Sequence, residues 1–173
     1  MRWFFGVIFF VSGAVFAAPS MYDMLSEDQY QSPLTMLHLV EQDHDGVISE
    51  FEIDVDNGQL NYRINLIDTV ESTITEFHYR ARDGALLRQR VDKLEADDAD
   101  ELEAANLLQK KKLTFSHLVE LATAKSTAYL VEAQLDHDLG ISYLELKLAD
   151  ESGKHKLAFD IENLRPLPLL KWD

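Results

Sequence analysis

Short runs of alternating apolar and polar residues fill much of the chain after residue 46. In residues 47–55, apolar or small side chains take every second position and mostly acidic side chains take the others. A period of two is typical of a strand with one buried face. An Asp-Asn-Gly sequence at 56–58 then predicts a hairpin turn, because Asn and Gly tolerate positive φ. Further runs at 60–66 and 73–80 complete a predicted three-stranded antiparallel meander.

An eight-residue sequence that precedes these strands recurs later in the chain. Leu-Thr-Met-Leu-His-Leu-Val-Glu at 34–41 returns as Leu-Thr-Phe-Ser-His-Leu-Val-Glu at 113–120, an offset of 79 with six of eight positions identical. Both copies predict a helix start, with Thr35 and Thr114 as N-caps and an apolar stripe at helical spacing. Alternating runs follow the second copy as well, at 129–136, 141–148 and 154–161.

The sequence therefore predicts an α+β protein of two tandem repeats, each a helix packed on a three-stranded antiparallel meander. In chain order we expect a signal peptide at 1–17, an N-terminal segment at 18–33, a first repeat at 34–91, an acidic connecting helix at 92–112, a second repeat at 113–168 and a tail at 169–173. The segment at 92–112 has acids in its first half and three lysines at its end, which matches a helix dipole. An interaction arm is the alternative for this segment.

The second predicted strand of each repeat resembles part of a known family, the PepSY domain. Tyr62-Arg63-Ile64-Asn65-Leu66 matches the Tyr-led strand of that family, and residues 144–148 match it with Leu144 in the place of Tyr. The order of helix, hairpin and third strand is similar too, and the two copies cover most of the chain after the signal peptide.

The small turn that closes a PepSY domain, Asp-x-x-Thr-Gly, is kept in part. Asp83 and Gly84 hold its last two positions in the first copy, where Arg80 replaces the Asp; in the second copy Asp160 is kept and Leu164 replaces the Gly. The resemblance implies an extracytoplasmic module, found in metalloprotease propeptides and in stand-alone secreted proteins, that is thought to inhibit or regulate proteases. It also implies that no catalytic residues are present.

The N-terminus predicts export. Arg2 precedes an apolar stretch of about 14 residues, shorter than the 20 or so that span a bilayer, and small residues follow it. We expect cleavage after Ala17, with Val15 and Ala17 at the two small-residue positions, and a periplasmic or secreted protein with no stable membrane insertion. An uncleaved anchor is the alternative.

Composition narrows the possible partners. The formal net charge of −15 makes nucleic acid an unfavourable partner. The absence of cysteine excludes disulfides, thiol chemistry and Cys-ligated metals.

One segment has the spacing of a calcium-binding loop. Oxygen donors stand at positions 1, 3, 5, 9 and 12 of an EF-hand pattern, with Gly46 at position 6; these donors are Glu41, Asp43, Asp45, Ser49 and Glu52. An EF-hand needs a helix after the loop, whereas the residues from 47 onward alternate as a strand, which argues against calcium. The tripeptide Asp-His-Asp at 43–45 is a weaker candidate for a divalent metal, and its recurrence at 136–138 falls at a different place in the repeat.

His38 and His117 occupy the same position of the two copies. They are either a pair of metal ligands or helix-face residues inherited by duplication, and the second interpretation is favoured. We therefore assign no catalytic, cofactor or metal site and expect no cofactor.

No catalytic motif appears in the sequence, so we expect a non-enzymatic binding module. The outward positions of the predicted strands form a polar face: Glu50, Glu52, Asp54, Arg63 and Glu76 in the first repeat, and Glu132, Gln134, Glu145 and Lys147 in the second. The hypothesis is that this acidic sheet surface regulates or inhibits a protease or another envelope protein. The alternatives are a small-ligand or divalent-cation sensor of an envelope signalling system and a purely structural role.

Overall fold

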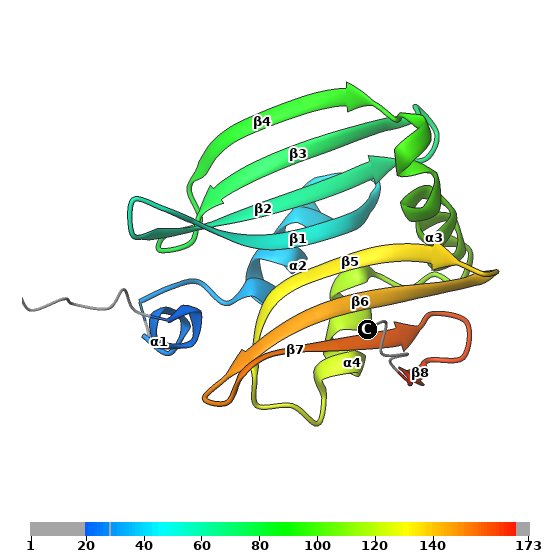
Figure 1. Cartoon of the computed structure of the whole chain (residues 1–173). Helices are drawn as coiled ribbons and strands as arrows, with labels where there is room; N and C mark the ends of the chain where they lie inside the picture. The colour runs from blue at the N-terminus through cyan, green and yellow to red at the C-terminus, as the bar shows by residue number, and fades with distance from the viewer. Residues whose placement is uncertain (1–19, 28, 169–173) are drawn as a thin grey trace, which may run out of the picture.

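The computed structural model describes residues 20–27 and 29–168. The predicted signal peptide at 1–17, its cleavage after Ala17 and the tail at 169–173 lie outside the described residues. The described part is an α+β fold with one eight-stranded antiparallel sheet, which confirms the predicted class. Its strand order is β4-β3-β2-β1-β5-β6-β7-β8 (Figure 1).

The elements follow one another in a simple order. They are α1 (Met21–Leu25), α2 (Pro33–Asp43), β1 (Val47–Asp56), β2 (Gln59–Asp68), β3 (Thr73–Arg80), β4 (Leu86–Lys93), η1 (Ala96–Asp98), α3 (Ala99–Lys110), α4 (Phe115–Thr123), β5 (Tyr129–Asp138), β6 (Ile141–Asp150), β7 (Gly153–Asp160) and β8 (Arg165–Leu167). Consecutive strands pair within each half of the chain, and β1 pairs with β5 at the centre of the sheet. The two halves therefore share one continuous sheet.

Each half has four strands where the sequence predicted three. The strand β4 was missed because all eight of its residues are exposed, so it has no alternation of burial. The strand β8 was missed because it has three residues and contains Pro166. The predicted connecting helix also begins too early: residues 92–93 belong to β4, and the helix α3 spans Ala99–Lys110.

The two predicted N-caps have different outcomes. Thr114 caps α4 as expected, since its hydroxyl accepts a hydrogen bond from the His117 N–H at 3.2 Å. Thr35 does not cap α2, which starts earlier, with Ser32 at the N-cap position and Pro33 in the first turn. Proline suits that position because its missing N–H would have no partner within the helix and its φ is already helical.

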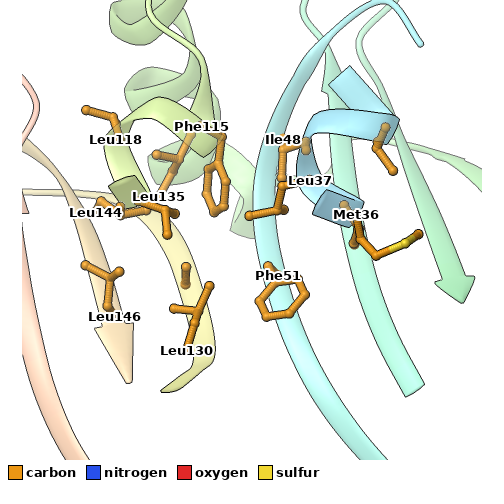
Figure 2. Close-up of a cluster of buried hydrophobic side chains, with 14 of the residues drawn as sticks. Met36, Leu37, Ile48, Phe51, Phe115, Leu118, Leu130, Leu135, Leu144 and Leu146 are labelled. Atoms are coloured by element: carbon orange, nitrogen blue, oxygen red, sulfur yellow. The ribbon is translucent and has the colours of Figure 1, made fainter. Parts of the chain in front are cut away.

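The helices α2 and α4 pack on one face of the sheet and on each other (Figure 1). Side chains from both halves meet in one core, in which Phe51 of β1 and Phe115 of α4 are fully buried (Figure 2). Burying a side chain of this size stabilises the fold by about 1.5–3 kcal/mol. The halves are therefore joined by this shared core as well as by the sheet, in which the β1–β5 ladder contains three residue pairs.

The ladder between β1 and β5 is short because the strands diverge. At one end, α3 packs against both strands and contributes Ala104, Ala105 and Leu108 to the core. Both central strands carry an irregularity where they meet their hairpin partners, at Ser49 in β1 and at Val131 in β5. An extra residue of this kind increases local twist and bends the strand.

Candidate functional site

The face of the sheet opposite α2 and α4 carries the polar positions of the strands. The register places Glu50 and Glu52 of β1 beside Gln134 and Glu132 of β5, so polar rows from the two halves are continuous across the junction. We call the following residues the open sheet face: Glu50, Glu52, Asp54, Arg63, Glu76, Glu132, Gln134, Glu145, Lys147 and Lys156.

Acidic groups of the open sheet face are paired with bases on neighbouring strands. The guanidinium of Arg63 contacts Glu52 and lies 3.7 Å from Glu50. The ammonium of Lys147 lies 2.6 Å from Glu132 of β5. Lys156 similarly contacts Glu145 at 2.7 Å. The open sheet face, which the sequence predicted to be acidic, therefore consists largely of paired acidic and basic side chains.

A second polar cluster lies where α3 meets the sheet. Glu101 of α3 accepts a hydrogen bond from Gln134 Nε2 at 2.7 Å. Burial raises the pKa of Glu101, against the lowering effect of Gln134 and Ser49. Burial also raises the pKa of Glu50, and the nearby Glu101 adds to this increase while Arg63 opposes it. This junction therefore contains two carboxyl groups that hold their protons to a higher pH than usual.

Ser49 adds an unsatisfied group to this junction. Its side chain is fully buried, and its hydroxyl makes no hydrogen bond within the described residues, although it lies close enough to Glu101 to influence that carboxyl. Sequence reasoning missed this cluster because α3 and β1 are far apart in the chain. Only the irregularity at Ser49 gives a hint, and it depends on the strand register.

The predicted calcium-loop donors do not converge. Glu41 binds the start of α4 instead. Its carboxylate accepts hydrogen bonds from the backbone N–H of Ser116, at 3.0 Å, and from the Ser116 hydroxyl. Glu52 contacts Arg63 on the open sheet face. The residues after Gly46 form a strand, as the alternation predicted, and not the second helix of an EF-hand.

Gly46 has a steric role in the turn between α2 and β1. Its φ is +132°, and an added Cβ would lie 2.7 Å from the backbone oxygen of Ile67. Only glycine fits this close approach without strain. A glycine at the sixth position of the calcium-like pattern is therefore explained by the packing of the turn against β2.

The structure brings His38 and His117 together around one carboxylate. Glu120 of α4 has one oxygen 3.3 Å from His38 Nε2 and the other 3.5 Å from His117 Nδ1. The rings are about half exposed, with exposed fractions of 46% and 49%. This arrangement links the surfaces of α2 and α4 by ion pairing when the imidazoles are protonated.

The two Asp-His-Asp tripeptides lie in different surroundings. The ring of His44 packs against Phe77, with 4.6 Å between centroids. His137 Nδ1 instead lies 2.8 Å from the Ser142 hydroxyl, and Asp136 accepts a hydrogen bond from Tyr143. Across residues 20–27 and 29–168, no group of three or more His, Asp or Glu side chains is placed to hold a metal ion.

A pocket of about 330 Å³ lies where the N-terminal segment meets both halves. Its lining includes Tyr30, Tyr62 and Tyr129, together with Val119 from α4. The Tyr62 hydroxyl donates a hydrogen bond to the Gln31 carbonyl at 2.6 Å, and burial raises the pKa of Tyr62 to about 12. The Tyr that carries the family resemblance therefore ties the N-terminal segment to β2.

The two edges of the sheet differ in length and protection. The strand β8 has three residues, and Pro166 in its middle lacks a backbone N–H. The strand β4 has eight residues, all exposed and none of them proline. Short strands and prolines protect an edge against pairing with another chain, so within residues 20–27 and 29–168 only β4 presents a long open edge.

No protein-family model matches this chain, and no curated protein matches it. Among solved structures, a candidate lipoprotein from Clostridium difficile 630 is similar, with a TM-score of 0.45 and 16% identity over 82% of this chain and 94% of that chain. This similarity is too weak to support an argument about family or function. Within the described residues, the helices are too short or too polar to cross a membrane.

Proposed function

We propose that this chain is an exported, non-enzymatic binding module that regulates or inhibits a protease or another envelope protein through the open sheet face. The observation that carries the proposal is the continuity of this face across the β1–β5 junction, where polar rows from both halves lie side by side. Paired charges across neighbouring strands suit recognition of a protein surface, since they fix orientation and disfavour wrong partners.

We also propose that the chain is a tandem duplication of a PepSY-like unit. Equivalent irregularities support this, because Ser49 and Val131 are each the unpaired residue of the first strand of their half. The closing turns support it as well: Gly84, with φ +69°, and Leu164, with φ +51°, both adopt the left-handed conformation after the third strand. The unit proposed here has four strands.

An inhibition panel tests the proposed function. The purified protein without residues 1–17 is titrated against the secreted proteases of the host, and an immobilised form is used to capture proteins from a periplasmic extract. The test variant is Asp54→Lys with Lys156→Glu, which changes one position in each half and leaves the net charge unchanged. The control is Glu120→Lys with Lys125→Glu on the helix side, which is also neutral overall.

We expect inhibition or capture that the sheet-face variant loses and the helix-side variant keeps. Thermal melting of both variants checks that each is folded. Absence of inhibition together with absence of a specifically captured protein would contradict the proposal, as would equal loss in both variants.

The pocket favours a second candidate function, the sensing of a small ligand. Its volume lies at the low end of the range for ligand pockets, about 300–1,000 Å³, and its tyrosines offer apolar rings and hydroxyl groups. A screen of small aromatic and amphipathic compounds by thermal shift tests this function. Narrowing the pocket with Val119→Phe should abolish any shift found, and a shift that survives this change would place the ligand elsewhere.

A further inference from the structure

We propose that β4 is a second binding site, at which an extended acidic segment of a partner protein adds as a ninth strand to the sheet. This site goes beyond the open sheet face because it uses the edge of the sheet and main-chain hydrogen bonds. In Figure 1, β4 forms the outer edge of the first half, and no helix of the described part of the chain runs along its outer side.

The backbone of β4 provides the first requirement for strand addition. All of its residues are exposed, so along its outer side the N–H and C=O groups that do not pair with β3 face solvent. An added strand satisfies these groups, and this pairing supplies affinity whatever the sequence of the partner. The other edge, β8, offers too few residues for such pairing.

Side chains on one side of β4 provide an apolar contact. The register aligns Leu86 with Tyr79 and Val91 with Thr75, on the side of the sheet where the helices lie. The exposed fractions of Leu86 and Val91 are 50% and 56%, so the helices do not cover this end of the layer. A partner strand with small β-branched residues on that side would cover both of them.

Two basic side chains on the other side of β4 favour an acidic partner. Arg88 and Arg90 stand two residues apart on the open side, and their exposed fractions are 55% and 58%. Arg88 lies 3.8 Å from Glu76, and one guanidinium nitrogen of Arg90 contacts the carboxylate of Asp92. Each guanidinium has five N–H donors, so both can still pair with a further carboxylate.

The charge of β4 contrasts with that of the chain. Its eight residues include three bases, Arg88, Arg90 and Lys93, and a single acid, whereas the chain as a whole carries −15. A second acidic copy of this protein would meet long-range repulsion as it approached. An acidic segment with carboxylates at alternate positions instead matches the spacing of the two arginines.

The test uses a fluorescein-labelled eight-residue peptide in which Val and Glu alternate, and its binding is followed by fluorescence anisotropy. A peptide with Lys in place of Glu controls for charge. Two further Val-Glu peptides carry N-methyl groups on alternate amides, one on the odd and one on the even positions, because only one set of amides faces the edge in an added strand. The protein variants are Arg88→Glu with Arg90→Glu, and a control with the same change in charge, Lys110→Glu with Lys112→Glu, at two exposed positions near the end of α3.

We expect the Arg88→Glu, Arg90→Glu variant to raise the dissociation constant of the Val-Glu peptide at least tenfold, and the Lys110→Glu, Lys112→Glu control to change it less than twofold. One of the two methylated peptides should lose binding and the other should keep it. The proposal is overturned if the Val-Glu peptide does not bind at 1 mM or if the peptide with Lys binds equally well. It is also overturned if both N-methylated peptides bind as well as the unmethylated one. A dimer in analytical ultracentrifugation that the arginine variant dissociates would assign the edge to a second copy and also overturn it.

Failure of this site and failure of the proposed function are distinguishable. Peptide binding is expected to depend on Arg88 and Arg90 at the β4 edge, whereas protease inhibition and capture are expected to depend on Asp54 and Lys156 of the open sheet face. Loss of peptide binding with intact inhibition would remove the edge site alone.

Discussion

Glu41 and Glu120 occupy the same position of the repeated helix sequence, and the structure gives them different roles. Glu41 is mostly buried, with 14% of its side chain exposed, and accepts two hydrogen bonds from Ser116 at the start of α4. Glu120 is 45% exposed and contacts only the imidazoles of two half-exposed histidines among the described residues. The same change, Glu→Ala, should therefore have different effects at the two positions.

The expected cost at Glu41 follows from the bonds that are lost. Ser116 is fully buried, so removing the carboxylate leaves its N–H without an acceptor, which the first turn of a helix cannot supply. Hydrogen bonds to charged groups contribute about 1.5–3 kcal/mol, and an unsatisfied buried donor costs about 1–3 kcal/mol. Because Ser116 Oγ keeps a possible bond to Thr114, at 3.0 Å, we expect a loss of about 2–4 kcal/mol for Glu41→Ala.

Chemical denaturation of the Glu41→Ala and Glu120→Ala variants measures how much each change lowers the free energy of unfolding. Glu120→Ala should cost less than about 1 kcal/mol, as exposed ion pairs usually do. The melting temperature should fall by about 4–16 °C for Glu41→Ala and by about 4 °C or less for Glu120→Ala, given about 2–4 °C per kcal/mol for a chain of this size. Equal costs at the two positions would refute the reasoning, because they would mean that repeat position, and not the tertiary contact with Ser116, sets the contribution.

Three further changes test other parts of the structure. Glu101→Gln should raise the melting temperature relative to wild type at pH 7.5 and lose this gain at pH 4, because the raised pKa of Glu101 means that the wild type loses stability as pH rises from the unfolded-state pKa through the folded-state pKa. Leu139→Asn should stabilise the β5–β6 hairpin by about 0.5–1 kcal/mol in a urea titration, since Leu139 has φ +50° and a bulky side chain disfavours this conformation. Gly46→Ala should lower the urea midpoint strongly, by about 3 kcal/mol or more in free energy, because its Cβ meets the Ile67 carbonyl at a φ that alanine rarely adopts.

Each of these predictions has a matched comparison. Glu103→Gln is the control for Glu101, because it makes the same change on the same helix at a side chain that is 65% exposed. For Leu139, the equivalent turn position of the first hairpin already holds Asn57, with φ +50°. Gly58→Ala is the control for Gly46, since open space surrounds Gly58. A Glu101→Gln variant that is equally destabilised at both pH values, a destabilised Leu139→Asn or a Gly46→Ala no worse than Gly58→Ala would contradict the respective argument.

Local pattern was sufficient for most of the strands. The run at 73–80 was predicted with the bounds of β3, because alternation and the turn residues beside it are short-range signals. It was insufficient at the edges, where β4 has no buried face and β8 is too short to show a period. The first helix was predicted to start at a threonine because the repeat suggested one N-cap for both copies, whereas Pro33 extends α2 toward the N-terminus.

The candidate sites depend more strongly on the tertiary structure. The outward acids of the strands could be predicted, but the pairing of Arg63 with Glu52 and of Lys147 with Glu132 follows from the register. The cluster at Glu101 requires α3 to pack against β1, which no local pattern specifies.

The sequence by itself determined the α+β class, the antiparallel hairpins and the start of α4 at Thr114, because periodicity, turn residues and caps act between residues close in the chain. Only the tertiary structure decided that the meanders join at β1 and β5, that Glu41 caps the opposite helix while Glu120 remains at the surface, and that β4 is left open. These features depend on contacts between residues more than 70 positions apart, such as Glu41 with Ser116, and on where the helix layer ends. Two nearly identical segments therefore have different functions in the fold, since their environments and not their sequences differ.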